Sequence, residues 1–192
     1  MTEAPLVAER AHLARLLEAI QRCVFFLDAS RQKQRWPLSG EALSAHAKDV
    51  GLFEALSAIN ERFGKLQDTL GSAMRHAALL AGEEHNTFLR TLAFYEKIGV
   101  LDSITRWQLA RATRNAAAHV YEPDYATIAE HFNALNALIP ALYGDSSRFV
   151  AYCRDNLSIT PAPGDFEQEF MDLTGRVGVA SDRANSGDSA FN

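Results

Sequence analysis

Apolar residues recur along most of the chain at intervals of three and four, which is the spacing of one face of an α-helix. A first helix is predicted from Pro5, which suits the first turn of a helix, to about Asp28. A second long helix follows a connection over residues 30–40, and its heptad spacing suits near-parallel packing against other helices. The two apolar stripes consist of Leu6, Leu13, Leu17, Ile20, Val24 and Leu27, and of Leu52, Leu56, Ile59, Phe63, Leu66, Leu70 and Ala73. Gly64 and Gly71 lie seven residues apart within the second stripe and lower its helix propensity, which predicts a close helix crossing or a slight bend there.

Three further helices are predicted. The third covers Glu83–Ile98 and is closed by Gly99, and either Asp102 or Ser103 then caps the fourth.

Pro123 excludes the α conformation at the residue before it, so the fourth helix is expected to end close to His119–Tyr121. The fifth begins near Asp124, and Pro140 is expected to kink or end it. Its apolar stripe consists of Ile128, Phe132, Leu135, Leu138 and Leu142. Because no segment shows convincing strand alternation, we predict an all-α protein, an up-and-down bundle of about five helices.

The chain changes character after Leu157. Residues 161–164 read Pro-Ala-Pro-Gly, and residues 182–192 are rich in Gly, Ser, Ala and Asp. We therefore predict a helical domain over residues 1–157 and a mostly disordered acidic tail over residues 158–192. Four apolar residues interrupt that tail and could dock onto the domain as one helical turn: Phe166, Phe170, Met171 and Leu173.

The net charge of −5 belongs to the tail. Residues 1–154 hold 17 basic and 17 acidic side chains, whereas residues 155–192 hold two basic and seven acidic ones. A broad nucleic-acid-binding surface is therefore not expected, and any contact with RNA must be local. No apolar run is long enough to span a membrane and the N-terminus does not resemble a signal peptide, so we expect a cytoplasmic protein.

The residues most suited to chemistry lie near the predicted end of the fourth helix. Arg114, Asn115, His119 and Tyr121 form the pattern R-N-x3-H-x-Y in a stretch, residues 103–121, that holds no Asp or Glu. Arginine presents a fork of donors to phosphate oxygens, and histidine can take up or release a proton near pH 7.

A helical wheel places Arg111, Arg114, Asn115 and His119 on one face. The opposite face, expected to pack on the rest of the protein, carries Leu109, Ala112, Ala116 and Val120. Trp107 lies close enough to the first face to flank a base, although packing in the core or in a dimer is the alternative use of its ring.

Other sites are not expected. The remaining histidines lack metal-ligand spacing, Cys23 and Cys153 lie too far apart to form a metal-binding motif, and no glycine-rich phosphate loop is present. We therefore expect neither a metal nor a cofactor.

The motif and the order of the helices over residues 6–143 resemble the HEPN superfamily, in particular HepT-like toxins and the substrate-binding subunits of minimal nucleotidyltransferases. The resemblance implies a homodimer whose two motifs face each other and cut RNA without metal. His119 would then be the acid/base group, Arg114 would stabilise the charged phosphorane and Asn115 would support both, while Arg111 and Trp107 would bind the substrate. Tyr121 would be the position at which a nucleotidyltransferase antitoxin attaches AMP.

Two alternatives stay open. The first alternative to the ribonuclease is a non-catalytic helical subunit of the same superfamily, which would serve as the partner of a minimal nucleotidyltransferase. It is also compatible with a helical adaptor in which the motif is accidental and the tail is the functional part.

Overall fold

The computed structural model describes residues 3–83, 87–116 and 124–186. They form seven α-helices, and none of them lies in a strand, so the all-α prediction is confirmed. The helices are α1 (Glu3–Arg31), α2 (Gly40–Ala45), α3 (Val50–Leu80), α4 (Phe88–Lys97), α5 (Ile104–Asn115), α6 (Tyr125–Leu157) and α7 (Glu167–Ser186). Two of these were not predicted as separate helices: α2 lies after the first connection, and α7 lies in the predicted tail. Within the described ranges, no helix is long and apolar enough to cross a membrane.

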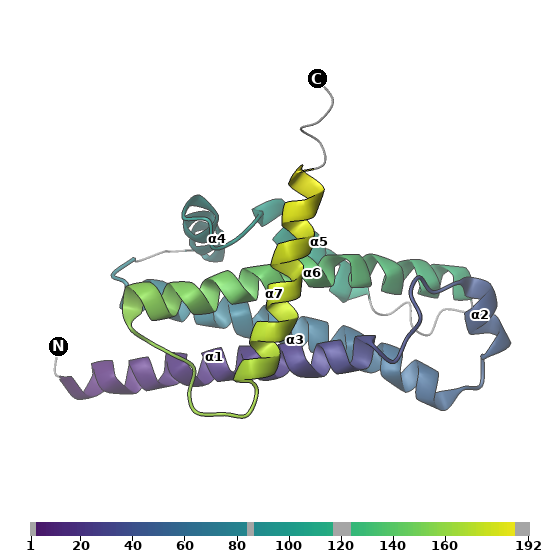
Figure 1. Ribbon diagram of the computed structural model, residues 1–192, viewed down its shortest axis with the longest axis horizontal. Coiled ribbons are helices and arrows are strands. Elements are labelled where there is room, and N and C mark those ends of the chain that lie inside the picture. The colour runs from purple at the N-terminus through teal and green to yellow at the C-terminus, as the bar shows by residue number, and fades with distance from the viewer. Residues whose placement is uncertain (1–2, 84–86, 117–123, 187–192) are drawn as a thin grey trace, which may run out of the picture.

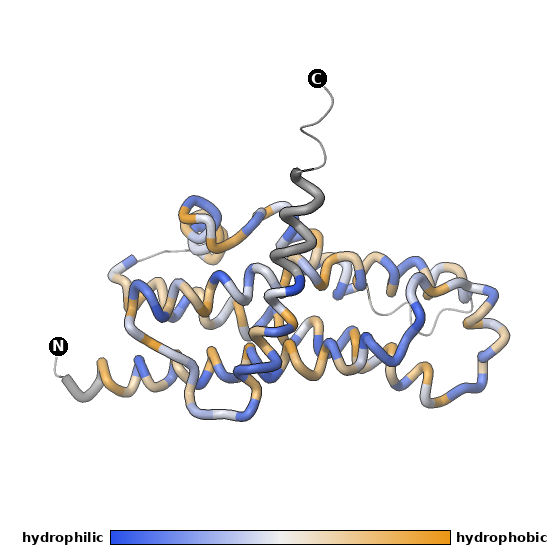
Figure 2. Tube along the Cα trace, viewed as in Figure 1, coloured by the Kyte–Doolittle hydropathy of each residue, from blue (hydrophilic) through white to orange (hydrophobic). Residues whose placement is uncertain are grey.

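The three long helices α1, α3 and α6 lie along the long axis of the molecule, and α7 crosses them (Figure 1). Their apolar stripes point inward, and hydrophobic and hydrophilic residues alternate along each of them (Figure 2). The stripes are those predicted from the sequence, except that Leu6 is 42% exposed at the free end of α1, while Leu52 and Leu138 are half-buried. Each fully buried leucine contributes about 1.5–3 kcal/mol to folding, so these three stripes supply most of the driving force.

Local signals set where the shorter helices begin. The Ser103 hydroxyl accepts a hydrogen bond from the Arg106 backbone N–H at 3.3 Å, which makes Ser103, one of the two predicted caps, the N-cap of α5. The N-cap of α4 is Thr87, so this helix begins at Phe88 and not at the predicted Glu83. It ends near the predicted position, because Gly99 adopts a left-handed conformation with φ of 74°.

Pro140 does not end α6, so one of the two outcomes predicted for this proline, an end of the helix, is wrong. The helix continues through it to Leu157, where Ser158 closes it in the left-handed conformation. An internal proline removes one backbone hydrogen bond at a cost of about 3 kcal/mol. Buried side chains lie on both sides of it, including Phe132, Ile139 and Phe149, and their packing outweighs that loss.

The predicted disordered tail is wrong for residues 159–176, which pack against α1 and α6. Ile159 and Phe170 are both 4% exposed, and the Ala162 N–H donates to the Ala14 carbonyl at 2.8 Å. Phe166 packs against Phe25, with ring centroids 5.3 Å apart. The expected docking is therefore confirmed for Phe166, Phe170 and Leu173, whereas Met171 is 59% exposed. These residues lie at the start of a 20-residue helix, where a single turn was predicted.

Candidate functional site

The face of α5 that packs on the protein is not the one that the wheel suggested. Trp107 and Ala110 are 4% and 5% exposed, whereas Leu109 is 56% exposed and Ala112 also faces outward. Trp107 lies edge-on to Phe88, with ring centroids 6.1 Å apart. The indole ring buries more apolar area than a leucine side chain does, and this decides the orientation of a helix with few apolar residues. Trp107 thus presents almost no surface on which a base could stack.

Arg114 follows Trp107 by seven residues and therefore also points toward the protein. One terminal nitrogen, Nη1, donates to the Gly64 carbonyl at 2.8 Å, and Nη2 donates to Asp68 Oδ1, also at 2.8 Å. Only 15% of the Arg114 side chain is exposed. The arginine is therefore fixed at the crossing of α5 and α3 and does not extend into solvent.

The two glycines of α3 explain how this crossing is possible. A Cβ atom at Gly64 would lie 3.1 Å from Arg114 Nη1. A Cβ atom at Gly71 would lie 3.1 Å from Phe88 Cζ and 3.4 Å from Trp107 Cζ2. The close approach predicted from these glycines is confirmed, and it brings side chains of α4 and α5 directly onto the backbone of α3.

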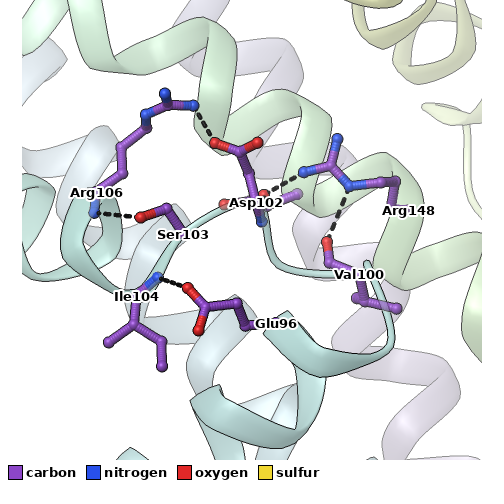
Figure 3. Close-up of polar contacts among 8 residues, drawn as sticks. Glu96, Val100, Asp102, Ser103, Ile104, Arg106 and Arg148 are labelled. Carbon is purple, nitrogen blue, oxygen red and sulfur yellow. Dashed lines mark hydrogen bonds and ion pairs between the residues drawn. The ribbon is translucent and has the colours of Figure 1, made fainter.

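Asp68 of α3 is the ion-pair partner of Arg114, although 65% of its side chain is exposed. The hydrogen bond from Arg114 lowers the pKa of the Asp68 carboxyl, and the nearby charge of Arg111 acts in the same direction. Asp102 likewise pairs with Arg106 (Figure 3). The stretch that lacks acids thus receives one carboxylate from its direct sequence neighbour, Asp102, and one from a distant helix, Asp68 of α3.

Two hollows flank the Arg114 guanidinium. The first is an open groove of about 430 Å³ between α3 and the C-terminal end of α5. Asn60 and the exposed Asn115 both line it. The side-chain oxygen of Asn60 is buried and has no hydrogen-bond partner among the described residues. Its other lining residues are Glu61, Gly64, Lys65, Asp68 and Arg114.

The second hollow is a cavity of about 100 Å³ on the other side of Arg114, and Arg75, Phe88 and Arg111 are among its lining residues. Arg75 lies over the Phe88 ring, with its guanidinium carbon 4.7 Å from the ring centroid. Within the described part of the chain, neither Arg75 nor Arg111 forms an ion pair.

Two polar atoms around this cavity lack a partner among the described residues, namely Arg114 Nε, which is a donor, and Gln67 Oε1, which is an acceptor. Both atoms are buried, and burying a polar atom without a partner costs free energy. The charge of the small cavity comes from its lining residues, which include three arginines, Arg75, Arg111 and Arg114, and one carboxylate, Asp68. Sequence reasoning missed Arg75, Gln67 and Asp68. The signal available for Asp68 and Arg75 was their spacing, since Gly64, Asp68, Gly71 and Arg75 lie on one face of α3.

The rest of the motif lies outside the described residues. α5 ends at Asn115, and the backbone N–H of its cap residue Ala116 donates to the Ala112 carbonyl. The helix is thus shorter than the predicted end near residues 119–121, and the wheel applies only as far as Asn115. His119 and Tyr121 belong to the segment 117–123, for which no placement is described. Among the described residues that line the groove there is no histidine.

The cysteine thiols and the potential metal ligands provide no second candidate site among the described residues. Burial raises the pKa of the Cys153 thiol to about 12 and also raises the pKa of Cys23, so neither is an activated nucleophile. The described residues contain no group of three or more side chains placed to hold a metal ion.

Neither a family model, nor a curated protein, nor a solved structure matches the chain. The resemblance to the HEPN superfamily therefore rests on the sequence motif and on the predicted order of the helices.

Proposed function

We propose that the protein is a metal-independent endoribonuclease of the HEPN type, the cytoplasmic toxin of a pair whose antitoxin is a nucleotidyltransferase. The observation that carries the proposal is the setting of Arg114. Two hydrogen bonds fix it between an open groove and a small cavity, and His119 follows five residues later in the sequence. It shares the small cavity with Arg75 and Arg111, which form no ion pair among the described residues.

The reaction that fits these groups is an internal transesterification of RNA. The ribose 2′-oxygen attacks the adjacent phosphorus, the bond from phosphorus to the 5′-oxygen breaks, and the products end in a 2′,3′-cyclic phosphate and a 5′-hydroxyl. His119 takes the proton from the 2′-hydroxyl, and a second acid, His119 of the other copy in a homodimer, returns a proton to the leaving oxygen. Arg114 stabilises the charge of the phosphorane, and Asn115 supports the pair.

The described residues add three roles to this scheme. Asp68 is a positioning residue, because it accepts a hydrogen bond from one terminal nitrogen of Arg114. Arg75 and Arg111 bind neighbouring phosphates, and such contacts set affinity without selecting a sequence. Trp107 is a lining residue of the small cavity and does not stack on a base.

Cleavage of a labelled RNA by the purified protein in EDTA tests the proposal. We expect products that end in a cyclic phosphate, and we expect Arg114→Ala and His119→Ala each to lower the rate at least ~100-fold, the usual size of a lost electrostatic or acid/base contribution. Arg90→Ala, an exposed arginine of α4 outside both hollows, is the matched control and should cleave normally. Cleavage that needs a divalent metal, or that survives both motif variants, would contradict the proposal.

One observation favours the second candidate, a non-catalytic partner subunit of a nucleotidyltransferase. Both terminal nitrogens of Arg114 already have protein acceptors, as in an arginine with a structural role. In that case the protein would not cleave RNA, and a co-expressed nucleotidyltransferase would transfer AMP to the wild type but not to Tyr121→Phe.

A further inference from the structure

A cavity of about 720 Å³ lies away from Arg114, between α1, α6, α7 and the connection from α4 to α5. It is larger than either hollow at Arg114 and falls in the size range of pockets that hold small organic ligands, about 300–1,000 Å³. Its wall depends on α7, because Leu173, Thr174 and Arg176 line it. Binding of a ligand in this cavity therefore does not depend on the ribonuclease activity proposed for the site at Arg114.

Four arginines from four different helices line this cavity: Arg31, Arg106, Arg148 and Arg176. Opposite charge among the lining residues comes only from Asp28 and Asp102. Asp28 pairs with Arg31, Asp102 pairs with Arg106, and Asp145, which lies close by, pairs with Arg148. Among the described residues, no carboxylate pairs with Arg176, so the lining keeps an excess of positive charge.

Most of these arginines donate hydrogen bonds to protein acceptors, but these contacts use only some of their N–H groups. Arg31 Nε donates to Asn136 Oδ1 at 2.6 Å, and Arg148 Nε donates to the Val100 carbonyl at 3.0 Å. Figure 3 shows Arg106 and Arg148 on either side of Asp102, which pairs with Arg106. A guanidinium has five N–H donors, so these contacts fix each group and leave donors for a ligand. Arg176 is exposed and forms no ion pair among the described residues.

The remainder of the lining is not charged. Leu138, Pro140 and Leu173 present apolar surface, and Ser147 and Gln32 add neutral polar groups. An inorganic anion would fill only a small part of such a cavity and would leave the apolar wall without a partner. The combination suits a ligand with an anionic end, an apolar body and a few hydrogen-bonding groups.

We propose that this cavity is a binding site for a nucleoside phosphate. Its phosphate group lies against Arg106, Arg148 and Arg176, where bidentate hydrogen bonds to the oxygens are available. Its base lies on the apolar wall formed by α6 and α7. Asp102 competes with the phosphate for Arg106, so it limits the affinity.

Isothermal titration of the full-length protein with the four ribonucleoside 5′-monophosphates tests this site. We expect at least one to bind with a dissociation constant in the micromolar range, and the matching nucleoside and inorganic phosphate each to bind at least ~10-fold more weakly. Arg106→Ala and Arg176→Ala should each weaken binding roughly 10-fold, which is the usual effect of losing a hydrogen bond to a charged group. Both residues are exposed, so these variants should fold normally.

Asp102→Asn provides a readout that a merely structural role would not produce, because removing the competing carboxylate should tighten nucleotide binding. Arg90→Ala is the control and should bind as the wild type does. Absence of binding below about 1 mM for all four nucleotides would overturn the proposal, as would equal binding of inorganic phosphate. If Arg114→Ala abolishes binding while Arg106→Ala has no effect, the nucleotide occupies the other site, and the proposal is wrong whether or not the protein cleaves RNA.

Discussion

The position of Arg114 depends on the absence of a side chain at residue 64. The guanidinium occupies the space that a Cβ atom and its substituents would need, and from there it reaches Asp68. A glycine in the middle of a long helix costs about 0.5–1 kcal/mol relative to alanine. At Gly64 this cost is offset by the two hydrogen bonds of Arg114, which a larger side chain at position 64 would crowd.

Gly64→Val should therefore displace the Arg114 guanidinium. We expect the free energy of unfolding to fall by about 1–3 kcal/mol, as for other overpacked sites. The pKa of Asp68, which the Arg114 hydrogen bond holds low, should rise toward its ordinary value. Urea unfolding and a carbon NMR titration of the Asp68 carboxyl measure the two effects.

Gly175→Val is the matched control, because a Cβ atom at Gly175 in α7 would meet no other atom within 4 Å. It should leave stability unchanged or slightly higher, since valine has a better helix propensity than glycine. Equal effects of the two substitutions, with Asp68 unchanged, would mean that Gly64 has no role in seating Arg114.

Among the elements, α5 shows where sequence reasoning fails. The stripes of α1, α3 and α6 could be predicted because each has many apolar residues at regular spacing, and burying the other face would expose all of them. α5 has few apolar residues, and the choice between Trp107 and Leu109 depends on what the neighbouring helices offer. Gly71 of α3 and Phe88 of α4 provide the space and the contact for an indole ring, and neither is near α5 in the sequence.

The same limitation applies to the site and to the tail. Arg114 and Asn115 could be identified from the motif, but Asp68, Gln67 and Arg75 join them only because α3 crosses α5. The composition of residues 158–192 indicated disorder, yet Phe166 and Phe170 bury enough apolar surface on α1 and α6 to fix the start of α7. Composition averages over a segment, whereas docking depends on a few residues in it.

Two alanine substitutions test the orientation of α5. Trp107→Ala should lower the free energy of unfolding by about 3–5 kcal/mol, because it removes a buried aromatic ring and leaves a cavity. Leu109→Ala removes an exposed side chain and should change stability by less than about 0.5 kcal/mol. Chemical denaturation of both variants measures the difference, and a larger loss for Leu109→Ala would mean that the opposite face of α5 is buried.

At the scale of the whole molecule, the fold gathers positive charge at two places, although basic and acidic residues are interspersed along the sequence. Residues 1–154 are neutral in sum, and Asp68, Asp102 and Asp145 each pair with one arginine. Among the described residues, no carboxylate pairs with Arg75 or Arg111 on the side of α3 and α5, or with Arg176 at the cavity that α7 lines. A chain with an acidic isoelectric point can thus present two local cationic sites to anionic ligands.

Asp145 makes the free energy of unfolding of the protein depend on pH. It is 5% exposed and accepts a hydrogen bond from the Asp102 backbone N–H at 2.9 Å. Burial raises its pKa to about 6 even though Arg148 is its ion-pair partner, because the loss of hydration exceeds the attraction. The folded protein therefore binds a proton at Asp145 more tightly than the unfolded chain does. Ionisation of this group destabilises the fold as the pH rises from about 4 to about 6.

Asp145→Asn should remove this dependence, because the amide oxygen can still accept the Asp102 hydrogen bond but cannot ionise. A pKa raised by roughly 2 units corresponds to about 3 kcal/mol, so the stability of the variant relative to the wild type should increase by up to that amount between pH 4 and pH 7. Urea unfolding at several pH values measures it. The carboxyls with lowered pKa, Asp68 among them, act in the opposite direction and at lower pH, since they lose their contribution as the pH falls below about 4. A stability difference between variant and wild type that stays constant from pH 4 to pH 7 would show that Asp145 remains ionised in the folded protein and that Arg148 compensates for its burial.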